Sequence, residues 1–590
     1  MKIPMPTHKY LQLLWIPVFM LSITAGPSEF GPSESSPSES SPHQQNPPNT
    51  DYKAITAGLD SLFSGWDSSE TPGCAVGAAV DGRQLLTRAW GMADLEHMIP
   101  NTPATIFEAG SVSKQFVTAS VILLAMEGKL SLEESIHEYV PEMPNYGHTI
   151  TLRHLMNHTS GLRDWGSVAA ISGWGRSVRT HHHDHVLDIL SRQTRLNFPP
   201  GERYSYSNSG YNLLAIVVER VSGRPFAEFS DQRIFQPLGM TSTQWRDDYT
   251  RIVPGRSSAY SGSEGDEEFR INRPIEHVHG NGGLLTTVGD LLAWNHAVFS
   301  GYFGEEFTEE LLHQGVLNSG RTIAYASGVR HDLDHGYPQI THTGATSGYR
   351  AYLSYYPEQK LSVALLCNVT GASPGPLGSS ISELFLGVDA AEDQELAEAG
   401  EEEAQRADAV ELSEEELASM AGIWKDPKNY RPLEIELKDR ELRLSSGTVL
   451  TPVDENRLVV GSSETVLMFE AETSGGSSNN RPAIRYIREE FEEERLVPVA
   501  LADEELDLLN YTGTFESRDA ETTIVLKEKD EGLIAHRRPA DTFELEPIYE
   551  GAFWAGGFGL IYFHSGGDGE VTGFSYSSGR VYDMRFDKVE

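Results

Sequence analysis

The chain has 590 residues, more than one ordinary hydrophobic core accommodates, so its length predicts two or three domains. Its 86 acidic and 46 basic residues give a formal net charge of -40. A surface this acidic repels phosphate backbones, which disfavours nucleic-acid binding as a function.

Residues 1–26 have the pattern of a secretory signal peptide. Lys2 and Lys9 give a basic start, and an apolar stretch follows from Leu11 to Ile23. That stretch is short for a membrane span, so we expect no stable span once the signal is removed. Residues 27–51 are rich in Ser and Pro and predict a flexible spacer. A secreted or periplasmic protein is the expectation.

The tetrad Ser111 to Lys114 opens the most apolar helical stretch of the chain, which continues from Phe116 to Met126. In a helix, a spacing of three places both side chains on one face, so the amine can hydrogen-bond the hydroxyl. A lysine in the first turn of a buried helix is partly desolvated, and the helix N-terminus also disfavours its charge. The pattern predicts a nucleophile with its base, whereas an isolated match would indicate a solvated helix turn.

Two further groups of polar residues follow in order. Tyr206 and Asn208 lie between a turn-rich loop and an apolar run that indicates a second buried helix. At this position Tyr206 could relay a proton, and Asn208 could hold the lysine or the substrate carbonyl. His342, Thr343 and Gly344 precede two alternating runs, Tyr349 to Tyr356 and Leu361 to Cys367, which predict adjacent strands. The glycine would let another backbone or a substrate come close.

The last part of the chain has a different composition. An acidic run from Glu392 to Glu416 predicts a solvated linker or helix. Two similar stretches follow, and each leads into a charged alternating strand, expected at Leu433 to Leu444 and at Thr522 to Leu533. A repeat of about 90 residues indicates two small antiparallel β modules.

Taken together, several ordered blocks resemble the serine β-lactamase and penicillin-binding-protein superfamily. The branch they resemble is class C β-lactamase-like and includes D-alanyl-D-alanine carboxypeptidases, D-aminopeptidases and related esterases. The blocks are Phe107 to Lys114, Leu155 to Leu162, Tyr206 to Asn208, Pro237 to Met240, Gly282 to Leu284 and His342 to Gly344. Because the three catalytic blocks occur in the expected order, the probability of a chance match is very small.

The resemblance implies an α/β (α+β) architecture, in which an antiparallel sheet flanked by helices forms a class C β-lactamase-like domain. This domain is expected over residues 52–388 and an acidic linker over 389–416, followed by two barrel-like β modules over 417–500 and 501–590. In D-aminopeptidases of the branch, a loop from such a module enters the catalytic cleft and restricts substrate size. Alternatively, the modules only stabilise the chain or bind a partner.

The resemblance also assigns roles at the site. Ser111 would attack a carbonyl and become acylated, while Lys114 and Tyr206 share the proton transfers. Asn208 would position the substrate amide, and the backbone N–H groups of Ser111 and Ala345 would hold the oxyanion. The resembling enzymes use no metal and no cofactor.

The chain departs from the β-lactamase pattern at His342, Thr343 and Gly344, where Lys-Thr-Gly is usual. A lysine there pairs with a substrate carboxylate, whereas a histidine is largely neutral near pH 7. The departure disfavours efficient β-lactam hydrolysis. It favours substrates without an obligatory carboxylate.

Two further features of the sequence are less decisive. The resembling sheet places its first strand beside its last, which would allow a disulfide between Cys74 and Cys367, but free buried thiols are the expected state. The cluster His181 to His183 with His185 could suggest a metal site. Adjacent histidines cannot all face one ion, so we predict no metal there.

These observations predict an exported serine hydrolase that works through an acyl-enzyme on Ser111. Its partners would be small molecules or short peptides, namely small esters or D-amino-acid amides and peptides. The alternatives are a D-alanyl-D-alanine carboxypeptidase or weak β-lactamase, and an inactive protein that binds cell-wall peptides or a partner. The sequence gives no oligomeric state.

Overall fold

The computed structural model describes residues 51–589 except 267, 388–409, 462, 464, 471–480, 489–492, 503–506 and 531. The predicted signal peptide, nearly all of the spacer and most of the acidic linker lie outside the described residues. Across the part of the chain that is described, no helix combines the length and apolar character needed to cross a membrane.

A six-stranded antiparallel sheet organises the N-terminal domain, with the order β10-β11-β12-β13-β1-β2. The two predicted adjacent strands are confirmed, because β12 and β13 have the expected bounds and pair with each other. The strands are β1 (Cys74–Val80), β2 (Arg83–Trp90), β10 (Arg330–Asp334), β11 (Tyr337–Thr346), β12 (Tyr349–Tyr356) and β13 (Leu361–Cys367).

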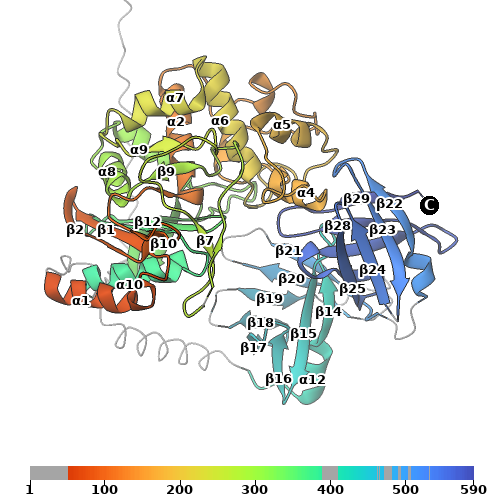
Figure 1. Cartoon of the computed structure of the whole chain (residues 1–590). Helices are drawn as coiled ribbons and strands as arrows, with labels where there is room; N and C mark the ends of the chain where they lie inside the picture. Colours follow the sequence, from red (N-terminus) through yellow and green to blue (C-terminus); the bar gives the residue numbers. More distant parts are fainter. Residues whose placement is uncertain are drawn as a thin grey trace, which may run out of the picture. The chain divides into compact units, whose positions relative to one another are not determined.

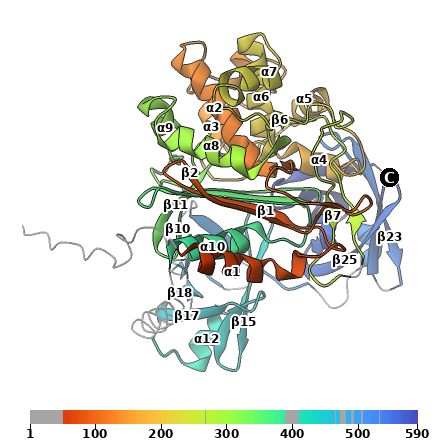
Figure 2. The ribbon, with the colours of Figure 1, turned by 60° about the vertical axis from the view of Figure 1, so that its left-hand side comes forward.

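Helices cover both faces of this sheet, as Figures 1 and 2 show. On one face, α1 (Tyr52–Leu62) and α10 (Pro374–Leu386) pack with the side chains of β1, β12 and β13 in one apolar cluster. On the other face lie α2 (Lys114–Met126) and α8 (Val288–Phe299). Because it is covered on both faces, β13 is buried along its whole length, as its unbroken apolar run favours.

The buried helix predicted after Ser111 is confirmed as α2, which is buried from Lys114 to Leu124. It packs against α6, the second predicted helix, and against α9. The other helices of this layer are α3 (Leu152–Met156), α4 (Trp165–Ile171), α5 (His183–Ser191), α6 (Asn208–Ser222), α7 (Phe226–Ser230) and α9 (Glu305–Leu311). Short strands pair in the loops: β3 (Met92–Asp94) with β4 (Ile99–Pro100), β9 (Leu284–Thr286) with both β5 (Phe107–Glu108) and β6 (Gln244–Trp245), and β7 (Tyr260–Ser261) with β8 (Arg270–Ile271).

The two predicted C-terminal β modules are confirmed as closed barrels. A short helix precedes each: α12 (Glu414–Met420) the first and η5 (Leu508–Tyr511) the second. The first barrel comprises β14 (Gly422–Lys425), β15 (Pro432–Lys438), β16 (Glu441–Leu444), β17 (Val449–Asp454), β18 (Arg457–Val460), β19 (Val466–Phe469), β20 (Ile484–Ile487) and β21 (Glu494–Val499). The second comprises β22 (Gly513–Ser517), β23 (Thr522–Lys529), β24 (Gly532–Arg537), β25 (Asp541–Tyr549), β26 (Ala552–Trp554), β27 (Leu560–Ser565), β28 (Val571–Ser577) and β29 (Met584–Lys588).

The prediction of one strand at Leu433 to Leu444 and one at Thr522 to Leu533 is wrong, because each stretch contains a turn between two strands. Each stretch is a hairpin or part of one, β15 with β16 and β23 with β24. Left-handed backbone makes the turns: φ is 51° at Asp439, 65° at Arg440 and 56° at Asp530. Alternation continues across so short a turn, which is why the pattern alone did not reveal it.

The expectation of free thiols at Cys74 and Cys367 is also wrong, because the two form a disulfide. The first strand β1 pairs with the last strand β13, and the register sets Cys74 directly opposite Cys367. The bridge joins residues separated by 293 positions in sequence.

Candidate active site

The predicted nucleophile and base are in contact at the start of α2. Ser111 lies in the turn η2 (Gly110–Ser113), and Lys114 is the first residue of the helix that follows. The distance from Lys114 Nζ to Ser111 Oγ is 3.1 Å. The Lys114 side chain is completely buried, so its amine is aimed at the serine rather than at solvent.

The surroundings of Lys114 favour a neutral amine. Burial lowers its pKa well below the ordinary value, and the positive charges of Arg580 and Arg176 lower it further, with Asp164 acting in the opposite direction. Nζ donates to Asn208 Oδ1 at 3.0 Å and to the backbone carbonyl of Asn281 at 2.7 Å. A neutral amine has two N–H groups and one lone pair, so with both N–H groups used the lone pair is left for Ser111.

Tyr206 and Asn208 reach the same place from the start of α6. The ring of Tyr206 lies 4.7 Å from Lys114 Nζ, and its hydroxyl is hydrogen-bonded to Ser111. Burial raises the pKa of Tyr206 well above its usual range, so the phenol keeps its proton at neutral pH. Asp164 fixes the entry of α6 by accepting a hydrogen bond of 2.8 Å from the backbone N–H of Asn208.

The edge of β11 closes the site opposite α6. Strand β10 pairs with β11 only as far as Thr341, so residues 342–346 form a free edge. Gly344 allows this edge to touch the Ser111 turn, because a Cβ at 344 would lie 2.1 Å from the carbonyl oxygen of Ala109 and 3.0 Å from the backbone nitrogen of Ser111. The approach is also close on the other side, because a Cβ at Gly110 would lie 2.6 Å from the backbone nitrogen of Ala345.

Burial keeps His342 in its neutral form, and two hydrogen bonds fix which ring nitrogen carries the proton. Nδ1 lies 2.6 Å from the carbonyl oxygen of Thr343, so it carries the proton, and Nε2 then accepts from the Tyr325 hydroxyl at 3.0 Å. Burial lowers the pKa of His342 to about 3, with the nearby Lys114 as a second cause. The residue that replaces the usual lysine therefore contributes no positive charge at neutral pH.

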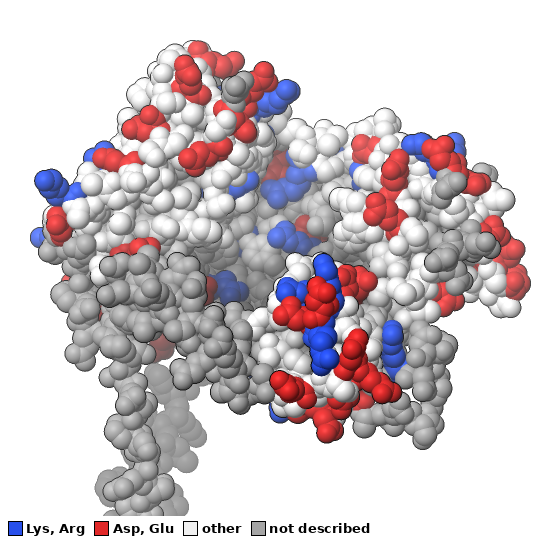
Figure 3. All heavy atoms as spheres, turned by 90° about the horizontal axis from the view of Figure 1, so that it is seen from below, with Lys and Arg blue, Asp and Glu red and all other residues white. Residues whose placement is uncertain are grey.

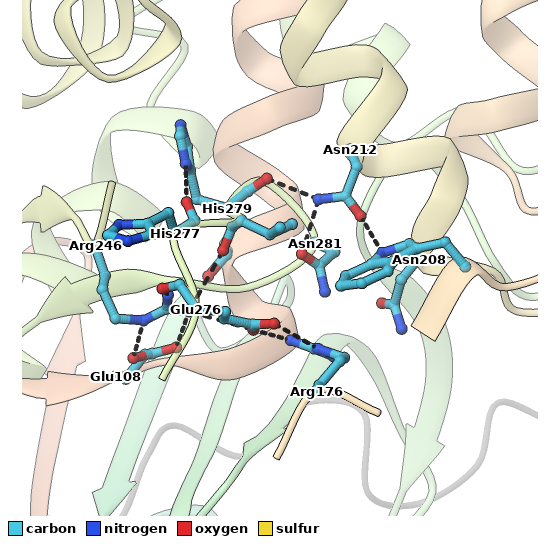
Figure 4. Close-up of polar contacts among 12 residues, drawn as sticks. Glu108, Arg176, Asn208, Asn212, Arg246, Glu276, His277, His279 and Asn281 are labelled. Carbon is cyan, nitrogen blue, oxygen red and sulfur yellow. Dashed lines mark hydrogen bonds and ion pairs between the residues drawn. The ribbon is translucent and has the colours of Figure 1, made fainter. Parts of the chain in front are cut away.

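No sequence pattern pointed to the residues that hold the acceptor of Lys114 in place. The Asn281 carbonyl that binds Lys114 is held through its own side chain, since Asn212 Nδ2 donates to Asn281 Oδ1 at 2.9 Å and to the His279 carbonyl at 2.8 Å (Figure 4). Asn212 in turn accepts from the indole N–H of Trp165 at 2.7 Å. In the sequence, Gly282 and Gly283 beside Asn281 marked this loop, but no pattern assigned a role to Asn281 or Asn212.

His158 is a second missed residue. Its Nδ1 accepts from the backbone N–H of Ser207 at 3.2 Å, and its ring lies 4.2 Å from the ring of Tyr206. Burial lowers its pKa well below the usual value, so it packs against Tyr206 as a neutral ring. The residue falls within a block that carried the resemblance, but no spacing linked it to Tyr206.

A chain of ion pairs, buried except at Arg176, joins four residues near the site (Figure 4). Arg246 pairs with Glu108 at 2.9 Å and with Glu276 at 3.5 Å, and Glu276 also pairs with Arg176. Glu108 lies three residues before Ser111, and Arg176 lines the active-site cavity. The network therefore connects the loop that carries Ser111 to the cavity wall.

Ser111 opens into a cavity of about 710 Å³. Its wall includes Tyr206, Asn208, His342, Thr343, Gly344 and Ala345, so it contains all the predicted site residues except the buried Lys114. It also includes Arg580, which follows β28 in the second barrel. The sequence had left open whether a C-terminal loop reaches the site.

The loop that carries Arg580 is fastened to the N-terminal domain through its backbone. Asn197 Nδ2 donates to the Arg580 carbonyl at 3.1 Å, and Asn197 Oδ1 accepts from the N–H of Tyr582 at 2.8 Å. The N–H of Asp164 also donates to the Arg580 carbonyl, at 3.3 Å. These contacts leave the Arg580 side chain to face the cavity.

The histidines from 181 to 185 point to different neighbours. His181 contacts the Trp174 carbonyl, His182 stacks on His277, and His183 contacts the His279 carbonyl. Within the described residues, no three His, Cys, Asp or Glu side chains are grouped so that they could hold a metal.

Comparisons with known proteins bear on the family and the fold of the chain. The profile of the Beta-lactamase family matches residues 59–378, more than half of the chain. A D-aminopeptidase from Cereibacter sphaeroides is 26% identical over 491 residues, covering 82% of this chain and 86% of the relative. A penicillin-binding protein from Bacillus subtilis is 28% identical over 326 residues, covering 52% of this chain and 71% of the relative. The structure of an octameric penicillin-binding protein homologue from Pyrococcus abyssi covers 76% of this chain and all of its own, with a TM-score of 0.51 and 22% identity.

The chain therefore belongs to the beta-lactamase family. Its site is that of a serine hydrolase.

Proposed function

We propose that the protein hydrolyses D-amino-acid amides and short peptides that begin with a D-amino acid, through an acyl-enzyme on Ser111. The long match to a relative named D-aminopeptidase supports this substrate class, because it extends beyond the β-lactamase domain into the C-terminal modules. The neutral His342 supports it as well, since the lysine that binds the carboxylate in β-lactamases has no charged counterpart at this position.

The observation that carries the proposal is the buried Lys114 amine, 3.1 Å from Ser111 Oγ with both of its N–H groups used elsewhere. An unprotonated amine in this position is a general base for the serine hydroxyl. A binding protein has no need of a desolvated lysine aimed at a serine. Burying that amine costs free energy, so its position beside a serine favours a catalytic role.

In the proposed reaction, Ser111 Oγ forms a bond to the substrate carbonyl carbon while its proton passes to Lys114 Nζ. The oxyanion is held by the N–H groups of Ser111 and Ala345. The C–N bond then breaks, and the leaving amine takes the proton from Lys114 through the Tyr206 hydroxyl. Water then attacks the acyl carbon, and its proton passes through the Tyr206 hydroxyl to Lys114. The bond between Ser111 Oγ and the acyl carbon breaks, Lys114 returns the proton to Ser111 Oγ, and the D-amino acid leaves.

We also propose that the protein is exported, on the basis of the signal-like residues 1–26. Expression of the whole chain in a bacterial host, followed by fractionation and N-terminal sequencing, tests this. A mature protein outside the cytoplasm that begins near residue 27 is the expected result. An uncleaved cytoplasmic chain would contradict it.

Turnover of D-alanine p-nitroanilide, with its L isomer as the stereochemical control, tests the activity. We expect hydrolysis of the D isomer and labelling of Ser111 by a fluorophosphonate probe. Ser111→Ala should lose both. Ser120→Ala is a matched control in the same helix, because its hydroxyl is bonded to the Phe116 carbonyl at 2.8 Å. Full activity in Ser111→Ala would refute the nucleophile, and no turnover by the unaltered chain would favour the binding protein.

A further inference from the structure

The active-site cavity is basic although the chain is strongly acidic. Four arginines line it (Arg176, Arg330, Arg350 and Arg580), against one acidic residue, Asp332. On the face seen in Figure 3, Lys and Arg side chains gather in a hollow while Asp and Glu side chains are spread over the surfaces around it. In a chain of net charge -40, such a concentration favours an anionic group in the ligand.

Among the four, Arg580 combines a long ion pair with a position beside Tyr206. Arg176 is paired with the buried Glu276, and Arg330 lies 3.9 Å from Asp332. Arg350 donates to the backbone carbonyls of Ser347 and Tyr349. The single ion pair of Arg580 in the described part of the chain is with Asp164, at 4.0 Å.

Asp164 is already engaged elsewhere. It accepts from the N–H of Asn208 at 2.8 Å and from the N–H of Ser167 at 2.9 Å. The Arg580 side chain remains 44% exposed, so its guanidinium has N–H groups left for a ligand. An arginine can bind a carboxylate through two parallel hydrogen bonds.

The position of Arg580 indicates which part of a substrate it meets. Its guanidinium carbon lies 4.9 Å from the centre of the Tyr206 ring. Tyr206 is the residue that passes a proton to the leaving amine in the proposed reaction. Arg580 and Tyr206 also line a second cavity of about 420 Å³, which gives room on this side. In the proposed reaction, a leaving group that takes its proton from Tyr206 would therefore lie nearer to Arg580 than the D-aminoacyl group would.

We propose that Arg580 binds a free carboxylate on the leaving group, so that the preferred substrates are short D-aminoacyl peptides with an unblocked C-terminus. This inference rests on the proposed function. It revises the expectation that the site has no cation for a carboxylate: a residue of the second barrel supplies the charge that His342 does not.

The test compares two substrates that differ only in this group, D-alanyl-glycine and D-alanyl-glycinamide. In the unaltered chain we expect kcat/KM to favour the free carboxylate, and Arg580→Gln to lower that preference at least tenfold, about 1.4 kcal/mol. Arg580→Lys should keep part of it. The loop should stay in place in both variants because it is fastened through the backbone. Arg585→Gln, which removes an arginine paired with Asp587 in the same barrel, is the matched control.

Binding measured in the Ser111→Ala background separates this inference from the proposed function. Calorimetric titration with each dipeptide should show the same loss of carboxylate preference when Arg580→Gln is added. A preference that is unchanged in Arg580→Gln, or equally reduced in Arg585→Gln, would overturn the inference. If the unaltered chain turns over neither dipeptide, the proposed function is wrong and the titration still decides the role of Arg580.

Discussion

Removal of the Asp519 carboxylate should weaken the junction between the second barrel and the N-terminal domain. Asp519 pairs with Arg163 at 2.6 Å, and the side chains are only 8% and 1% exposed. Burial lowers the pKa of Arg163, while the Asp519 charge acts in the opposite direction. Arg163 nevertheless stays ionised, so Asp519→Ala leaves a buried charge without its counter-ion.

The structure sets the size of this effect. Loss of one partner of a buried ion pair typically lowers the free energy of unfolding by about 3–5 kcal/mol. The lower end applies here because Arg163 keeps three other acceptors: the Gln193 side chain and the carbonyls of Tyr582 and Asp583, at 3.0–3.1 Å. The loss should therefore be about 3 kcal/mol in the free energy of unfolding.

Urea unfolding followed by tryptophan fluorescence and circular dichroism measures this loss. Glu470→Ala, which breaks the exposed pair with Arg495, should cost less than about 1 kcal/mol. The double variant Arg163→Met with Asp519→Leu should recover most of the stability, because it leaves no charge unpaired. If Asp519→Ala costs no more than Glu470→Ala, or the double variant is no better than the single one, the reasoning about this buried charge is wrong.

Three further predictions follow from the site. The kcat/KM for D-alanine p-nitroanilide should reach its plateau well below the pH at which an ordinary lysine loses its proton, because the proposed base is the unprotonated Lys114 and its pKa is lowered. Arg580→Gln should move the acid limb to higher pH, and a rate that keeps rising to about pH 10 would contradict a neutral Lys114. Gly344→Ala should lower kcat by about 10²–10³, because the added Cβ would force β11 away from the Ser111 turn. Gly289→Ala should leave kcat unchanged, because the atom nearest to its added Cβ is 3.9 Å away. Equal kcat values for the two variants would refute the close approach. The pKa of His342 is lowered to about 3 in the folded chain, so as the pH falls the unfolded chain binds a proton at this residue first. Between about pH 6.5 and 3, His342 should therefore reduce the free energy of unfolding by up to about 1.4 kcal/mol per pH unit. An identical loss on acidification in His342→Gln would exclude His342 as its source.

Local structure was predictable where consecutive residues carry the information. The apolar run after Ser111 became the buried helix α2, and the alternation from Tyr349 to Cys367 became the β12–β13 pair with the expected bounds. The spacing of Ser111 and Lys114 predicted their contact, because three residues of helix fix it. The repeat predicted two β modules, although not the hairpin turns within the alternating runs.

Only the tertiary structure decided which distant residues meet. His342 Nε2 accepts its hydrogen bond from Tyr325, and the second N–H of Lys114 binds the Asn281 carbonyl. The disulfide depends on the exact register of β1 against β13. The positive charge at the site comes from Arg580, far along the chain in a separate barrel. Helix and strand periodicity describe neighbours within a few residues, whereas these contacts depend on how whole layers and modules pack, which no local pattern specifies.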